Sequence, residues 1–191
     1  GKNKILSNFA IIKKIDTMKT LGKLILITLI IALIGFIFKM TLIPGGGLLL
    51  VISLSIASIL LLIQSIVICI KFKNNKTQKW LSALMSIALS ICLMYILFRY
   101  QWWGGWRLLF LLGMPSFVFI TLLFLAYKDK IITVEYKKSF LKNIVLPWVF
   151  VFVFGLISVV MSGKAFYNTF NYSRQNMTYE KFIEWCYEEN D

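Results

Sequence analysis

Apolar residues fall in long blocks along this chain, separated by short polar or glycine-rich connections. A helix needs about 20 residues to cross a hydrocarbon core of about 30 Å. The blocks that reach this length are Leu21–Ile43, Leu48–Ile70, Trp80–Tyr100, Arg107–Tyr127 and Ile144–Gly163. No acidic residue lies inside any of them. The pattern therefore predicts an all-α integral membrane protein with five transmembrane helices.

Both ends of the chain are more polar than these blocks. Residues 1–20 mix lysines with scattered isoleucine and phenylalanine, which is typical of a basic amphipathic helix on an anionic membrane surface. Residues 164–191 become polar and then acidic. We expect a cytoplasmic N-terminal segment and an acidic tail outside the membrane.

A short helix is expected within this tail. Apolar side chains recur there at the spacing of one helix face: Tyr179, Phe182, Ile183 and Cys186. Thr178 precedes them and is a suitable N-cap. A helix this short needs a surface to pack on. That surface is either the end of the bundle itself or a partner subunit.

Composition agrees with a chain made mostly of membrane helices. Hydrophobic residues make up 59% of it and charged residues only 15%, whereas about a quarter of a soluble domain is charged. The mean hydropathy is +0.80. The formal net charge of +13 comes from lysines at the ends of the blocks. It therefore indicates membrane topology, and we expect no nucleic-acid partner.

The distribution of lysines predicts the orientation. They cluster in residues 2–23, 71–79 and 128–142, which would all lie on the same side of a five-helix chain. Loops rich in lysine and arginine stay in the cytoplasm. The expected topology has the N-terminus in the cytoplasm and the C-terminus outside, in the inner membrane of a bacterium.

Two connections between blocks share a sequence pattern. FKMTLIPGGGLL starts at Phe38 and FRYQWWGGWRLL starts at Phe98, an offset of 60 positions (98 − 38). Glycine adopts positive φ readily, and proline cannot continue a helix, so both connections suit tight reversals. We interpret residues 21–70 and 80–127 as two copies of one transmembrane hairpin, an internal repeat.

A basic residue occupies the same place in each copy. Lys39 and Arg99 lie about one helical turn inside the expected outer boundary. They could reach outward to lipid headgroups. Alternatively, both could point into the bundle and hold an anionic headgroup or a carboxylate of a partner.

The first copy also carries a family resemblance. Its G-F-I-F-K-x4-P-G-G-x-L-L pattern, Gly35 to Leu49, resembles the N-terminal hairpin of GldL, an inner-membrane protein of gliding motility and type IX secretion. It is also similar to a broader set of Bacteroidota membrane proteins with an F-K-x-x-H-W-P-G-A turn. The resemblance implies a Bacteroidota inner-membrane protein. GldL-like motor proteins have an intramembrane carboxylate that is absent from these blocks, so the resemblance does not imply motor function.

Groups that perform catalysis are scarce in this sequence. It contains no histidine, and all acidic residues lie outside the apolar blocks. Acid–base and metal-assisted catalysis depend on such groups. We therefore expect no enzyme, no catalytic residues, no metal and no cofactor. Gln64 is the strongly polar residue placed deep in a block.

Small residues on the third block point to helix packing. Ser82, Ser86 and Ser90 are spaced by four residues and form one stripe. Such stripes let membrane helices approach closely. The stripe is expected to pack within the bundle or against another subunit.

Two functions fit these observations. The first is a non-catalytic accessory subunit of a larger inner-membrane complex, whose partners are membrane lipids and other integral membrane subunits. The alternative is a small transporter or permease for an uncharged or amphiphilic substrate, suggested by the duplicated hairpins and the Lys39 and Arg99 pair.

Overall fold

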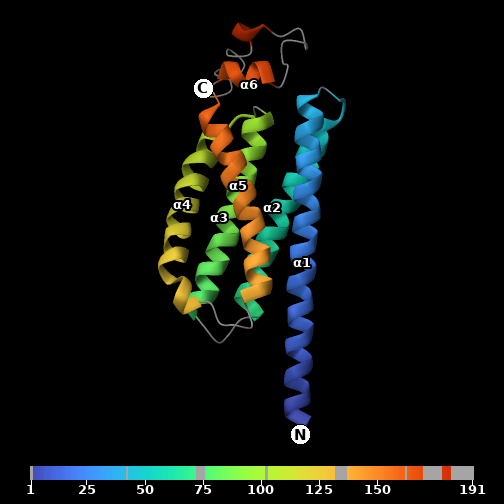
Figure 1. Cartoon of the computed structure of the whole chain (residues 1–191), viewed down its shortest axis with the longest axis vertical. Coiled ribbons are helices and arrows are strands. Elements are labelled where there is room, and N and C mark those ends of the chain that lie inside the picture. The colour runs from blue at the N-terminus through green and yellow to red at the C-terminus, as the bar shows by residue number, and fades with distance from the viewer. Residues whose placement is uncertain are drawn as a thin grey trace.

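The fold is an antiparallel bundle of long helices, given by a computed structural model (Figure 1). The structure describes residues 2–41, 43–71, 76–101, 103–131, 137–161, 163–169 and 178–181. The helices are α1 (Lys2–Met40), α2 (Gly46–Lys71), α3 (Lys76–Gln101), α4 (Trp106–Ile131), α5 (Lys137–Val160) and α6 (Gly163–Thr169). The helix ends follow the predicted connections closely, because glycines and lysines mark them.

Among the described residues, four helices are long and apolar enough to cross a membrane. Their apolar parts are Thr20–Met40, Gly46–Ile70, Lys79–Gln101 and Trp106–Tyr127. The apolar part of α5, Ile144–Val160, is shorter. The predicted all-α, multi-pass character is confirmed for the part of the chain that is described, whereas the fifth span stays a prediction.

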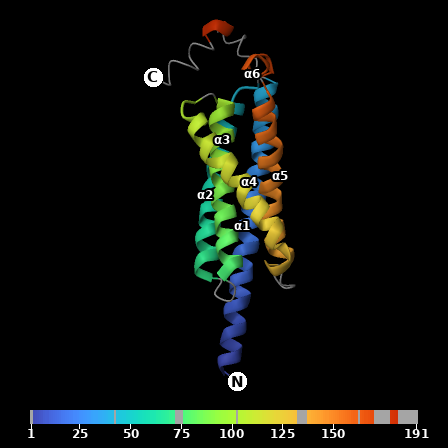
Figure 2. The ribbon, with the colours of Figure 1, turned by 90° about the vertical axis from the view of Figure 1, so that its left-hand side faces the viewer.

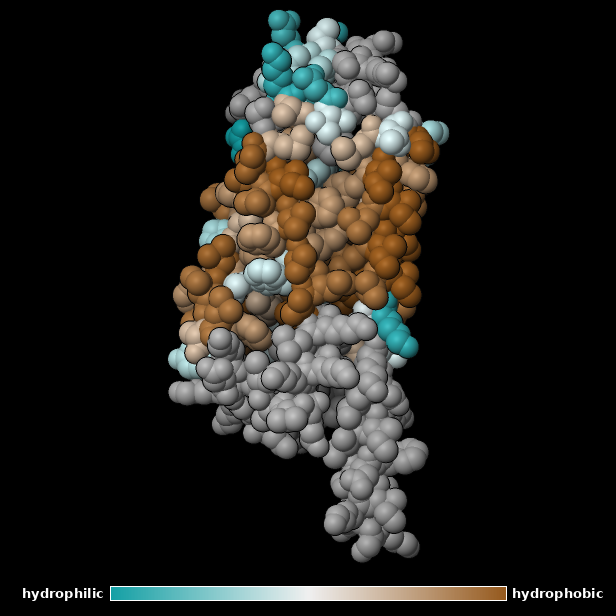
Figure 3. All heavy atoms as spheres, in the orientation of Figure 1, coloured by the Kyte–Doolittle hydropathy of each residue, from teal (hydrophilic) through white to brown (hydrophobic). Residues whose placement is uncertain are grey.

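The lateral surface of the bundle is apolar. Figure 3 shows a broad band of hydrophobic side chains across the middle of the face in view, with polar side chains above the band at the end that carries α6. Ile66, Leu111 and Val160 are all exposed on this surface. Exposed aliphatic side chains at this density need a hydrocarbon solvent, since soluble proteins rarely expose large apolar patches.

Helix α3 is the centre of the bundle. It packs against α2, α4 and α5, and α1 packs against α2 and α5 (Figures 1 and 2). Within the apolar parts, 72% of α3 is buried but only 17% of α4. Helix α4 is therefore peripheral and packs mainly on α3.

The two ends of the bundle differ. Helix α1 extends beyond the other helices at its N-terminal end, and α6 lies at the opposite end (Figure 1). Residues 2–20 belong to the same helix as the first span, although the side chains expected to make this segment amphipathic lie outside the described residues. We call the end of the bundle that carries α6 and the two glycine-containing turns the α6 end.

Candidate functional site

The two glycine-containing turns have the same backbone geometry. Gly45 has φ of +91° and Gly105 has φ of +80°. The carbonyl of each glycine accepts a hydrogen bond from the N–H four residues later, of Leu49 at 2.9 Å and of Leu109 at 3.2 Å. These bonds begin α2 and α4. The positive φ explains why a glycine stands at both positions.

The helix ends before the turns also match. The N–H of Ile43 donates to the carbonyl of Phe38 at 2.9 Å, and the N–H of Trp103 donates to that of Phe98 at 3.0 Å. Such bonds satisfy carbonyls that would otherwise lack partners at the end of a helix. Both turns therefore end one helix and begin the next in the same way.

The other two glycines of the first turn differ in the space around them. A Cβ atom on Gly46 would lie 2.5 Å from the backbone nitrogen of Lys39, so α2 meets the backbone of α1 there. A Cβ atom on Gly47 would lie 3.5 Å from the side-chain amide of Gln101, an ordinary contact. Of the three glycines, Gly45 alone has positive φ.

Lys39 reaches from the first hairpin to the end of α3. Its Nζ donates to the backbone carbonyl of Tyr100 and, at 3.0 Å, to Oε1 of Gln101. The amide of Gln101 in turn donates to the carbonyl of Gly47 at 2.8 Å. The C-terminal end of a helix carries partial negative charge, so an ammonium group is stabilised there. Lys39 thus joins α1 to α3, and Gln101 joins α3 to α2.

Arg99 points into the bundle and is 8% exposed. Its Cζ atom lies 4.2 Å from the ring centroid of Trp106 and 4.9 Å from that of Phe166. A flat guanidinium group stacks well on aromatic rings, and this attraction strengthens when water is excluded. Arg99 therefore connects α3 to the start of α4 and to α6.

Aromatic rings fill the space beneath α6. Phe36 stacks on Phe154 with centroids 4.4 Å apart and meets the edge of Tyr100 at 4.7 Å. Tyr100 also meets Phe166 at 5.1 Å, and Phe166 is completely buried. This group of rings, the α6-end aromatic cluster, connects α1, α3, α5 and α6. Helix α6 was not predicted from the apolar pattern, although the aromatic pair Phe166 and Tyr167 just after the fifth block is a local signal for it.

The serine stripe of α3 is buried within this chain. Ser82, Ser86 and Ser90 are each at most 2% exposed. The hydroxyl groups of Ser58 and Ser90 lie 2.7 Å apart, and Ser90 also donates to the carbonyl of Ser58 at 3.0 Å. Ser86 donates to the carbonyl of Ser82 within its own helix at 3.1 Å. The stripe therefore packs in the bundle, with Ser90 joining α3 to α2.

The tail is described at residues 178–181. Thr178 accepts a hydrogen bond from the N–H of Lys181 at 3.4 Å, in the manner of the predicted N-cap. The ring of Tyr179 meets the edge of Tyr167 on α6 at 5.4 Å. This contact places Tyr179 against the chain's own α6. The other residues of the predicted docking face, Phe182, Ile183 and Cys186, lie outside the described part of the chain.

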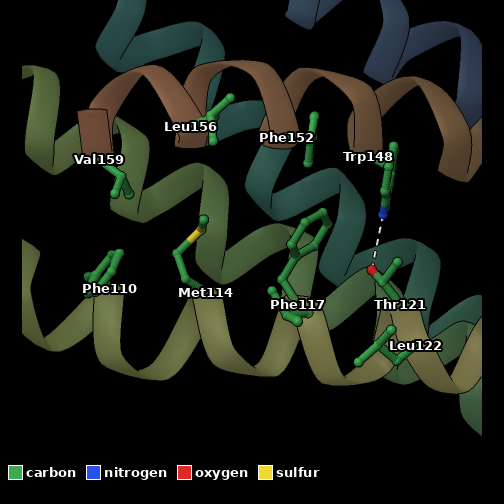
Figure 4. A pocket seen from close by; sticks show the side chains of 10 residues that line it. Phe110, Met114, Phe117, Thr121, Leu122, Trp148, Phe152, Leu156 and Val159 are labelled. Carbon is green, nitrogen blue, oxygen red and sulfur yellow. Dashed lines mark hydrogen bonds between the residues drawn. The ribbon is translucent and has the colours of Figure 1, made fainter. Parts of the chain in front are cut away.

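An apolar groove runs between α4 and α5 (Figure 4). Its volume is about 450 Å³, and we call it the α4–α5 groove. The residues that line it are Phe110, Met114, Phe117, Val118, Thr121 and Leu122 of α4 with Trp148, Phe152, Leu156 and Val159 of α5. At one end the indole N–H of Trp148 donates to the hydroxyl of Thr121 at 3.0 Å. A second apolar pocket of about 260 Å³ shares these two residues.

Sequence reasoning missed this groove because every residue that lines it suits a lipid-facing helix. The groove depends on the distance between α4 and α5 where both pack against α3. Hydrophobic periodicity does not determine that distance. Trp148 lies in the groove, and its ring stacks on that of Phe152 with centroids 5.4 Å apart.

The buried polar groups do not assemble a reactive centre in the described part of the chain. No group of three or more His, Cys, Asp or Glu residues is close enough there to hold a metal. Tyr95 and Ser158 share a hydrogen bond of 2.7 Å between α3 and α5. The amide of Gln64 is completely buried and has no hydrogen-bond partner among the described residues. Apart from Gln64, these polar side chains serve contacts within or between helices.

Comparison with known proteins gives no relative from which to transfer a function. No protein-family model, curated protein or solved structure is significantly similar to this chain.

Proposed function

We propose that this chain is a non-catalytic structural subunit of a larger protein complex in a bacterial inner membrane. The proposal is supported by polar side chains that form hydrogen bonds between helices. Ser58 bonds Ser90, Tyr95 bonds Ser158, and Lys39 bonds the end of α3, so each connects one helix to another. Interhelical hydrogen bonds of this kind fix a bundle in one arrangement.

Five transmembrane helices form part of this proposal. Helix α5 is 24 residues long as a whole, although its apolar part is shorter. An odd number of crossings agrees with the positions of α6 and the N-terminal end of α1 at opposite ends of the bundle (Figure 1). The lysine distribution then favours the N-terminus in the cytoplasm and the α6 end outside.

The orientation can be tested with reporters fused after residue 191. A periplasmic alkaline phosphatase should be active at this position, and a cytoplasmic fluorescent protein should not. The same pair of reporters placed in the connection at residues 72–75 gives the matched control, with the opposite result expected. Activity of the cytoplasmic reporter at the C-terminus would contradict the five-span topology.

The repeat and the family resemblance support a proposal about how the chain evolved and in which bacteria it occurs. Matching turn geometry at Gly45 and Gly105 favours duplication of an ancestral hairpin. The F-K-x4-P-G-G turn resembles that of GldL-like proteins and favours a Bacteroidota membrane. The proposal takes only this hairpin from the resemblance.

Transport is the weaker proposal. It was motivated by Lys39 and Arg99, but Lys39 bonds α3 and Arg99 lies between two aromatic rings. Among the described residues, buried hydroxyl groups form two separate pairs, Ser58 with Ser90 and Tyr95 with Ser158, or bond backbone carbonyls, as Ser53 does, and these bonds form no continuous polar path. Flux of an amphiphilic substrate that requires both basic residues, and is lost in a Lys39→Ala, Arg99→Ala double variant that still folds, would favour transport over a structural role.

Co-purification tests the main proposal. Native membranes are solubilised in a mild detergent, and the chain is followed by blue-native electrophoresis and mass spectrometry. The expected result is an assembly much larger than 22.1 kDa that contains other integral membrane proteins. Dissociation in a harsher detergent gives the control for a specific assembly. A monomer in every mild detergent would overturn the proposal.

A further inference from the structure

Gln64 is the polar member of the most buried face of α2. The residues of this face are spaced alternately by four and three, and each is at most 2% exposed: Leu50, Leu54, Ala57, Leu61, Gln64 and Ile68. In the described part of the chain, neither Oε1 nor Nε2 of Gln64 has a hydrogen-bond partner. A buried amide without a partner costs free energy, because its bonds to water are lost and not replaced. Gln64 therefore needs a partner that the packed helices do not supply.

The register of α2 on α3 places Gln64 near the serine stripe. The hydroxyl groups of Ser58 and Ser90 lie 2.7 Å apart, and the two helices run antiparallel (Figure 1). Six residues after Ser58 on α2 correspond to six residues before Ser90 on α3. Gln64 is therefore level with the middle of the turn between Ser82 and Ser86.

Ser86 offers an acceptor at this level. It is completely buried, and its hydroxyl donates to the carbonyl of Ser82 at 3.1 Å. A hydroxyl oxygen that donates its proton still has lone pairs, and the amide of Gln64 has two N–H donors. No direct hydrogen bond joins the two side chains. Polar groups separated by more than hydrogen-bond distance are commonly bridged by water.

Water is the ligand that suits this position best. Lipid and other subunits cannot reach Gln64, because it is completely buried by the chain's own helices. The described residues offer no group of three or more acidic, histidine or cysteine side chains for a metal. A water molecule takes about 30 Å³ and both donates and accepts hydrogen bonds. Gln64 and the flexible, buried Met85, which is at the same level of α3, can change rotamer to admit it.

From the unpaired amide, the register and the buried hydroxyl together, we infer that Gln64 and Ser86 bind one internal water molecule that bridges α2 to α3. The water accepts a hydrogen bond from Nε2 of Gln64 and donates one to Oγ of Ser86. It adds a third polar contact to this helix pair, after Gln101 with Gly47 at the α6 end and the serine pair in the middle. This inference does not depend on the proposed complex, because it concerns the single chain.

Radiolytic footprinting of the unmodified chain in lipid nanodiscs tests this inference. A pulse of X-rays converts water, including water bound inside a protein, to hydroxyl radicals, and mass spectrometry then identifies the oxidised side chains. Met85 should be oxidised about fivefold faster than Cys92, because a buried sulfur meets radicals only from water beside it. The two residues are matched, since both lie on α3 and are at most 2% exposed. Cys92, however, packs against Gly113 of α4.

The direction of the stability change gives a second, independent test. Gln64→Leu removes the amide at similar size, and Ser86→Ala removes the hydroxyl. Each should lower the folding equilibrium constant about threefold, as expected for a polar contact between membrane helices, and the double variant should lower it no further. Ser53→Ala is the control, because its hydroxyl bonds a carbonyl of its own helix, and its effect should add to that of Gln64→Leu. Gln64→Leu should also slow the oxidation of Met85 to the rate of Cys92.

Three outcomes would overturn the inference. Equal oxidation of Met85 and Cys92 in the unmodified chain would mean that no water lies beside Gln64. A higher folding equilibrium constant for Gln64→Leu would mean that the amide stays unpaired in a dry core, because an apolar side chain removes that cost. Coupling between Gln64 and Ser86 without rapid oxidation of Met85 would mean a direct hydrogen bond.

Discussion

The two glycine-containing turns are alike in backbone and different in the use of their basic residue. Both have a glycine with positive φ, and both make equivalent hydrogen bonds at the helix ends. Lys39, however, reaches across to the end of α3, whereas Arg99 lies between Trp106 and Phe166. The basic residue of the first turn therefore connects the first hairpin to the second, whereas that of the second turn connects the second hairpin to α6.

The residue that begins the following helix explains this difference. Gly46 begins α2, and the absence of a side chain lets α2 meet the backbone of Lys39. The equivalent position in the second turn is Trp106, whose ring covers Arg99. Gly46 permits a close approach of two helices in the first turn, and the ring of Trp106 provides an aromatic partner for the cation in the second. Similar turns can thus support different tertiary contacts.

Substitution of Gly46 should have the largest effect on the first turn. Gly46→Ala places a Cβ 2.5 Å from a backbone atom that cannot move aside, and we expect a loss of about 3 kcal/mol in the free energy of unfolding, as for other overpacked sites. Gly47→Ala, with ordinary contact distances, is the control and should change little. Reversible unfolding in mixed micelles measures both. Equal losses would mean that the helices are not in close contact at Gly46.

Substitution of the glycines with positive φ tests the shared geometry. A Cβ at Gly45 or Gly105 would meet no atom within 4 Å, so the cost is backbone strain alone. Gly45→Ala and Gly105→Ala should each lower the free energy of unfolding by about 1–2 kcal/mol. The two losses should agree closely, as measured by the same unfolding assay. A large loss at one turn with none at the other would show that the turns are not equivalent.

Exchange of the basic residues tests the difference between the turns. Arg99→Lys keeps the charge but loses the flat group that stacks on two rings, and should cost about 1 kcal/mol. Lys39→Arg keeps donors for the carbonyl of Tyr100 and for Gln101 and should cost less. Unfolding of both variants in one detergent gives the comparison. Equal tolerance of the two exchanges would contradict distinct roles.

Much of this architecture is predictable from the sequence because membrane helices have strong local signals. The lengths of the apolar blocks predict the four helices that are long enough to cross a membrane, and the spacing of Ser82, Ser86 and Ser90 predicts a stripe that is buried. The offset between Phe38 and Phe98 gave two turns whose geometry agrees. These features depend on length, period and glycine conformation, which act within a few residues.

Other features depend on distances between helices and could not be predicted. The direction of Lys39 follows from the position of the last turn of α3 beside it. The burial of Phe166 follows from α6 lying across the end of the bundle, and the α4–α5 groove follows from the separation of two helices on α3. A linear pattern specifies which face of a helix is apolar but not what lies opposite.

Double-mutant cycles test the central claim most directly, namely that Lys39 and Arg99 connect different elements from equivalent turns. The variants are Lys39→Met, Gln101→Leu, Arg99→Met and Phe166→Leu, each unfolded alone and in pairs. Coupling should be about 0.6 kcal/mol for Lys39 with Gln101, typical of polar pairs in membrane proteins, and about 1 kcal/mol for Arg99 with Phe166. The crossed pairs, Lys39 with Phe166 and Arg99 with Gln101, should show almost none. Coupling in the crossed pairs as large as in the direct pairs, or none in the direct pairs, would contradict the account.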